Sequence, residues 1–171
     1  MLKAFGVILV ICGTSAWGVF GVLRLWRRCR ILAELTGAVG AIRSEITTRL
    51  TPVPELISRL ASETGEPVRS FFNSIETRLG YIGEYTLYEI WCDALTNTPE
   101  LLLLGDERDA LREVPRALGR YDLEEQRLAL NHTEQQLEQF RQRACDARVR
   151  DSKIKGTIGV AAGLFIVLLL I

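Results

Sequence analysis

Two stretches without a charged side chain, one at each end of the chain, constrain its fold more than any other feature. Residues 4–23 and 156–171 contain no Asp, Glu, Lys or Arg, whereas all 21 acidic and 20 of the 21 basic residues lie within 24–155. Twenty helical residues reach about 30 Å, the thickness of the hydrocarbon layer of a bilayer. We therefore predict transmembrane helices at 4–23 and 156–171. A short tip at 1–3 precedes the first helix, and a separate polar domain at 24–155 lies between the two.

Basic residues border the polar domain on both sides. They follow the first uncharged stretch and precede the second: Arg24, Arg27, Arg28, Arg30, Lys153 and Lys155. Basic residues beside a membrane span stay in the cytoplasm. Both clusters therefore predict a cytoplasmic domain at 24–155 and both chain termini on the far side of the membrane. A cleaved signal peptide is disfavoured, because no small-residue cleavage site follows the first stretch.

Apolar residues in the polar domain recur with the period of a helix. The clearest stripe lies in a helix expected at 28–50, and consists of Ile31, Leu35, Val39, Ile42 and Ile46. Similar patterns predict helices at about 52–63, 68–79, 84–96, 106–114 and 122–150. In the last helix, one heptad position is filled by Leu123, Leu130, Leu137 and Ala144. The expected fold class is all-α: a cytoplasmic helical bundle of about six helices, flanked by N- and C-terminal transmembrane helices.

Three positions carry residues typical of helix ends. Thr51 is expected to cap a helix in which Pro52 occupies the first position and Glu55 faces the positive end of the dipole. Asp106 is expected to cap the next-to-last helix and Asp122 the last one.

The four cysteines, Cys12, Cys29, Cys92 and Cys145, lie in four different segments and form no C-x-x-C pair. This spacing disfavours a zinc site and shows no disulfide framework. We expect isolated thiols in a reducing compartment.

Little in the sequence points to catalysis. The 21 basic and 21 acidic residues balance, so the chain has no general attraction for nucleic acid. The single histidine, His132, is expected on the solvated face of the last bundle helix, and no phosphate-binding or nucleophile motif appears. We predict no enzyme activity, no catalytic residue, no cofactor, no metal and no small-molecule substrate. A membrane-bound enzyme acting on lipid or cell-wall precursors remains the less favoured alternative.

Several short motifs occur in a defined order along the chain. They comprise Glu45, Ile46, Thr51, Pro52, Glu55 and Leu56, then Trp91, then Leu118, Gly119, Asp122, Glu124 and Gln126, and finally Lys155 before the terminal span. Together with the two spans, these motifs resemble the stage III sporulation protein AB family of endospore-forming bacteria.

The resemblance implies a membrane component of the complex between mother cell and forespore. It implies a cytoplasmic domain similar to the inner-membrane platform proteins of type II secretion and type IV pili. Expected partners are a motor ATPase in the mother-cell cytoplasm, other membrane subunits of the channel, and membrane lipid. A membrane scaffold without a motor partner is the main alternative.

Seven of these motif residues are the candidate partner-binding residues: Thr51, Pro52, Glu55, Leu118, Gly119, Asp122 and Gln126. The chain departs from the family pattern at Val114 and Pro115, where a glycine-containing turn is more usual. Proline inside a helix is expected to end or bend it here, at Val114.

Overall fold

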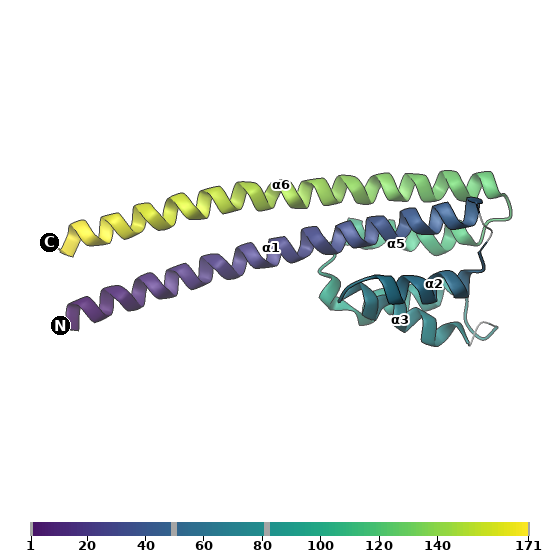
Figure 1. Ribbon diagram of the computed structural model, residues 1–171, viewed down its shortest axis with the longest axis horizontal. Coiled ribbons are helices and arrows are strands. Elements are labelled where there is room, and N and C mark those ends of the chain that lie inside the picture. The colour runs from purple at the N-terminus through teal and green to yellow at the C-terminus, as the bar shows by residue number, and fades with distance from the viewer. Residues whose placement is uncertain (1, 49–50, 81–82, 171) are drawn as a thin grey trace. The chain divides into compact units, whose positions relative to one another are not determined.

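The computed structural model describes the backbone of residues 2–48, 51–80 and 83–170. It describes the side chains of residues 23–48, 51–80, 83–147, 149 and 150. The described backbone forms six α-helices and one short 3₁₀ turn, without an extended strand (Figure 1): α1 (Leu2–Thr48), α2 (Val53–Glu63), α3 (Val68–Leu79), α4 (Leu87–Asn97), η1 (Pro99–Leu101), α5 (Gly105–Leu118) and α6 (Leu123–Leu170). The predicted all-α fold is confirmed.

The chain divides into two compact units. Residues 30–141 form one unit, a helical bundle, and residues 1–29 and 142–171 form the other from the outer parts of α1 and α6. Within the described residues, no helix is both long enough and apolar enough to cross a membrane. Apart from Leu23, the side chains of the spans expected at 4–23 and 156–171 lie outside the description, and membrane insertion stays a prediction.

Apolar stripes build the core of the bundle. All five residues of the α1 stripe from Ile31 to Ile46 are buried. An aromatic cluster lies in the same core, where the Phe71 ring packs edge-on against Phe72 and Trp91 at centroid distances of 5.0 and 5.2 Å. Such pairs favour a single arrangement of the core beyond the gain from burial alone.

The heptad stripe of α6 is only partly buried. Leu130, Leu137 and Ala144 are buried as predicted, but Leu123 is 48% exposed. Leu123 is the first residue of α6, so it lies at the edge of the bundle rather than within it. This heptad position is therefore buried at Leu130, Leu137 and Ala144 but not at Leu123.

Two of the expected helix ends differ in the structure. Asp106 lies inside the first turn of α5, and the Glu107 carboxylate, rather than that of Asp106, accepts a hydrogen bond from the Leu104 N–H at 2.8 Å, just before the helix begins. Helix α5 also continues through Pro115 to Leu118. Val114, Pro115 and Ala117 are buried, and this packing offsets the loss of one helical hydrogen bond at the proline.

The connections between helices alternate between the two ends of the bundle. Figure 1 shows the end of α1 and the starts of α2 and α6 at one end. We call this the three-turn end and define it by residues 51–52, 83–86 and 119–122. The opposite end carries the connections at 64–67 and 98–104, and we call it the pocket end.

In the other unit, Cys29 and Cys145 form a disulfide, with their Cα atoms 5.3 Å apart. The expectation of isolated thiols is wrong for this pair, because two helices distant in sequence bring the side chains together. Cys92 is free and half-buried. The side chain of Cys12 lies outside the described residues.

Candidate partner-binding site

The turn between α5 and α6 is held by hydrogen bonds from side chains to backbone. Gln126 Nε2 donates to the carbonyl oxygens of Leu118 and Arg120, at 3.3 and 2.5 Å. Asp122 Oδ1 accepts from the Glu124 N–H at 2.9 Å and caps α6 as predicted. These bonds satisfy backbone groups that a helix end leaves without intrahelical partners. The turn therefore has a defined shape, and Leu118, Gly119, Asp122 and Gln126 form its frame.

This frame turns apolar side chains toward solvent. Tyr121 is fully exposed, with a relative accessibility of 106%, and Leu123 and Leu128 are 48% and 61% exposed. Single exposed apolar residues are normal, so Tyr121, whose exposure is complete, is the strongest candidate among them for contact with a partner. Aromatic side chains are also enriched among the residues that dominate protein interfaces.

The connection between α1 and α2 is ordered by a carboxylate on α1. Glu45 Oε2 accepts a hydrogen bond from the Thr51 hydroxyl at 2.9 Å, and Glu45 Oε1 pairs with the Arg59 guanidinium at 2.8 Å. The hydrogen bond to Glu45 raises the pKa of Arg59 above its ordinary value. Thr51 consequently makes no cap, and Pro52 rather than Thr51 precedes the first residue of α2. The predicted cap and first position of this helix are therefore wrong by one residue, whereas Glu55 lies in the first turn of α2 as predicted.

The seven candidate partner-binding residues lie at or next to the three-turn end, in two groups. Thr51, Pro52 and Glu55 lie at the start of α2, and the other four belong to the turn between α5 and α6. Pro52 and Glu55 are exposed, whereas Thr51 and Gln126 are half-buried and bonded within the bundle. Sequence reasoning missed Tyr121, which is outside every apolar stripe. The signal that could have found it is an aromatic residue in a turn that belongs to no apolar stripe.

Acidic side chains outnumber basic ones among the exposed residues at this end of the bundle. Among the exposed residues of 51–55, 83–86 and 119–128, five are acidic and two are basic: Glu55, Glu84, Asp122, Glu124, Glu125, Arg120 and Arg127. Glu124 pairs with Arg127 at 2.8 Å, and Arg120 pairs with Glu125 at 3.4 Å. The exposed charges at this end of the bundle are thus predominantly acidic.

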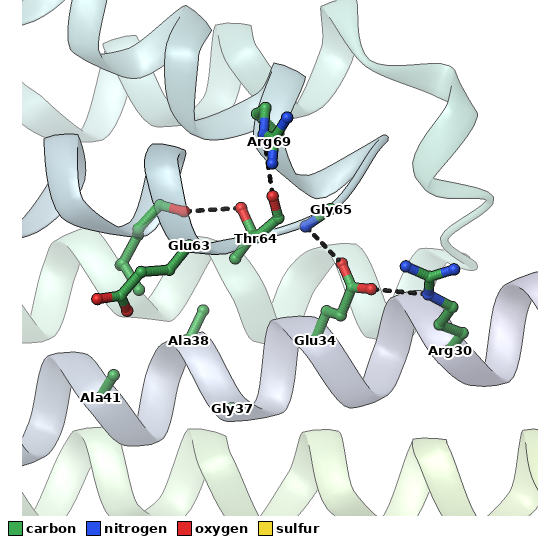
Figure 2. A pocket seen from close by; sticks show the side chains of 10 residues that line it. Arg30, Glu34, Gly37, Ala38, Ala41, Glu63, Thr64, Gly65 and Arg69 are labelled. Carbon is green, nitrogen blue, oxygen red and sulfur yellow. Dashed lines mark hydrogen bonds and ion pairs between the residues drawn. The ribbon is translucent and has the colours of Figure 1, made fainter.

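The pocket end has a different character. A hollow of about 490 Å³ lies beside the connection from α2 to α3, and charged side chains line it (Figure 2). Glu34 contacts the Arg30 guanidinium at 2.9 Å and accepts from the Gly65 N–H at 3.2 Å, while Arg69 donates to the Thr64 carbonyl at 3.0 Å. The Glu34 carboxylate therefore ties the connection to α1, and the Arg69 guanidinium binds the connection at the Thr64 carbonyl.

The described side chains include no group of three His, Cys, Asp or Glu residues placed to hold a metal ion. His132 is exposed on α6, as its position in the sequence predicts.

Known proteins share both the sequence pattern and the fold. The sequence model of the family described as stage III sporulation protein AB matches residues 3–171. Stage III sporulation protein AB of Bacillus subtilis (strain 168) is 27% identical over 176 residues, which cover 99% of each chain. A solved structure of stage III sporulation protein AB has a TM-score of 0.66 at 22% identity, over 72% of this chain and 98% of that one, and so shares the fold. Because the family match extends over nearly the whole chain, the protein belongs to the stage III sporulation protein AB family.

Proposed function

We propose that this protein is a non-catalytic membrane platform in the secretion-like complex between mother cell and forespore, and that its helical bundle binds a motor ATPase in the mother-cell cytoplasm. The proposal rests on membership of the sporulation family. The single observation that carries the binding role is the fully exposed Tyr121, presented on the hydrogen-bonded turn between α5 and α6.

A fixed turn makes Tyr121 a favourable anchor. Binding costs free energy when flexible groups are immobilised, and a preorganised backbone lowers that cost. Gln126 bonds two carbonyl oxygens of this turn, so its backbone is ordered before any partner arrives. A tyrosine on such a turn has only its ring rotations to lose, and it combines a large apolar face with a polar hydroxyl.

The position of the three-turn end suits a cytoplasmic partner. Helix α1 ends there at Thr48 and α6 begins there at Leu123, whereas the proposed spans occupy the other ends of these two helices in sequence. The spans would contact lipid and the other membrane subunits of the channel. The three-turn end would remain available to the ATPase.

The acidic surroundings of Tyr121 indicate the chemistry of the partner surface. An apolar depression rimmed by Lys and Arg would complement five acidic side chains set against two arginines. Rim charges act mainly on the rate of association, so binding should weaken as ionic strength rises.

An affinity measurement tests the proposal. The full-length protein, reconstituted in lipid nanodiscs, is titrated with the purified ATPase of the complex, and Tyr121→Ala is compared with wild type. Because truncation of a central aromatic anchor commonly costs about 2 kcal/mol, we expect a loss of at least about tenfold in affinity.

Leu104→Ala is the control, because Leu104 is an exposed apolar side chain, 57% accessible, at the pocket end. This variant should bind as wild type does. Equal losses in the two variants would contradict the assignment of the surface. No binding by the wild-type protein would contradict the motor partner and favour the scaffold alternative.

A further inference from the structure

Two cysteines that are far apart in sequence meet on neighbouring helices. Cys29 on α1 and Cys145 on α6 are separated by 116 residues, yet their Cα atoms are 5.3 Å apart. This separation lies within the range that a disulfide spans without movement of the backbone. Both residues are half-buried, so neither is fully shielded from solvent.

We propose that the Cys29–Cys145 disulfide is a reversible oxidation site, at which low-molecular-weight disulfides convert the two reduced thiols into the observed cross-link between α1 and α6. Cys92, the other cysteine whose side chain the structure describes, is free. The site therefore has the two thiols that a reversible intramolecular reaction requires, and Cys92 provides an internal comparison.

The reaction is a thiol–disulfide exchange in two steps. The thiolate of Cys29 attacks one sulfur of oxidised glutathione, so the bond between the two glutathione sulfurs breaks and one glutathione thiolate leaves. The thiolate of Cys145 then attacks the Cys29 sulfur of this mixed disulfide and releases the second glutathione thiolate. The protein loses two protons and two electrons, and one oxidised glutathione becomes two reduced molecules.

The cross-link would fix the contact between the two helices. It closes a loop that contains all of residues 30–144, and thus the bundle, so α1 and α6 can no longer separate at residues 29 and 145. Thiols in a cytoplasm are normally kept reduced, and the bond would form when the proportion of oxidised glutathione rises. The site is independent of ATPase binding, and either proposal can fail alone.

Mass spectrometry tests the site directly. The full-length protein in detergent is incubated with either reduced or oxidised glutathione, free thiols are blocked with N-ethylmaleimide, and peptides are analysed without reduction. We expect oxidation to remove the N-ethylmaleimide label from Cys29 and Cys145 together and to yield one linked peptide pair. Cys92 should carry only the label or a single glutathione.

Serine variants serve as controls. Cys92→Ser should form the same cross-link as wild type. In Cys29→Ser, Cys145 should carry a glutathione and no linked peptide should appear. A separate glutathione on each of Cys29 and Cys145 in the wild-type protein, or a bond from either residue to Cys12 or to a second molecule, would overturn the proposal.

Hydrogen exchange tests the consequence for the helices. Amides near residues 29 and 145 should exchange several-fold more slowly in the oxidised wild-type protein than in the reduced one, because the bond suppresses local opening. Cys29→Ser should show no such change. Equal exchange in oxidised and reduced wild-type protein would contradict the proposed fixing of the two helices.

Discussion

At the pocket end of the bundle, buried and half-buried carboxylates accept hydrogen bonds from backbone N–H groups, whereas at the three-turn end an aromatic side chain is fully exposed. Glu34 contacts Arg30 and the Gly65 N–H, and Glu107 is buried while it accepts from the Leu104 N–H. The three-turn end uses similar bonds from side chain to backbone, but Gln126 binds its turn from the bundle side. Tyr121 is left fully exposed on the outside.

This difference separates structural residues from surface residues within one motif. Gln126 and Asp122 satisfy backbone groups of two helix ends, which explains their residue types without any partner. Tyr121 and Leu123 have no comparable role in the bundle, since both are exposed. Changes at the pocket end should therefore alter stability alone, and changes at the three-turn end should alter binding.

The largest effect on stability is expected from Glu107→Ala at the pocket end. It leaves the Leu104 N–H without its acceptor and empties a site where Glu107 is only 2% exposed. The free energy of unfolding should fall by about 2 kcal/mol, with unchanged affinity for the ATPase. Denaturant unfolding in detergent gives the first quantity and nanodisc titration the second. Asp106→Ala, at the neighbouring exposed position, should cost less than about 1 kcal/mol.

Gln126→Ala should lower both stability and affinity. Loss of its two hydrogen bonds should cost about 1 kcal/mol of unfolding free energy and loosen the turn that presents Tyr121. Affinity should therefore fall less than in Tyr121→Ala. Gln135→Ala is the control, because this exposed glutamine on the same helix should cost no more than about 0.5 kcal/mol. If Gln126→Ala bound the ATPase with wild-type affinity, this result would contradict a role of the turn in presenting the binding surface.

A smaller effect is expected from Glu34→Gln. The amide oxygen can still accept from the Gly65 N–H, but the ion pair with Arg30 is lost. Because the Arg30 side chain is 61% exposed, the pair should contribute only about 0.5 kcal/mol, and less at high salt. Thermal unfolding at low and high ionic strength measures this difference. A loss of affinity in this variant would contradict the division between the two ends.

The smallest effect concerns pH at the three-turn end. The backbone N–H of Thr86, followed by its hydroxyl, holds the pKa of the Glu89 carboxyl below its ordinary value of 4.5. A lowered pKa in the folded state contributes stability above pH 4.5 that is lost as pH falls through the lowered value. Between about pH 6 and about pH 3, the midpoint temperature of thermal unfolding should thus fall less steeply in Glu89→Gln than in wild type. Thr86→Ala keeps the backbone donor and should give an intermediate slope, whereas identical slopes in all three proteins would contradict this account.

Periodicity predicted most of the bundle, because burial of one helical face decides both residue type and backbone form. Helix α3 has the bounds expected from its stripe, 68–79. The start of α2 was displaced because the Thr51 hydroxyl donates to Glu45 rather than accepting from the backbone. That choice depends on a contact between two helices, which local patterns do not contain.

The candidate site was predictable only in part, for the same reason. Motif residues such as Asp122 and Gln126 located the turn between α5 and α6. The exposure of Tyr121 and the pairing of Cys29 with Cys145 depend on how distant helices pack. Spacing along the chain carries no information on such contacts.

Photo-crosslinking in sporulating cells tests the central claim most directly. A photoreactive phenylalanine analogue is placed in the full-length protein at Tyr121 or, in a control variant, at the exposed apolar Leu104 of the pocket end. We predict that irradiation links position 121, and not position 104, to the motor ATPase. Capture of the ATPase from position 104 but not from position 121 would contradict the account.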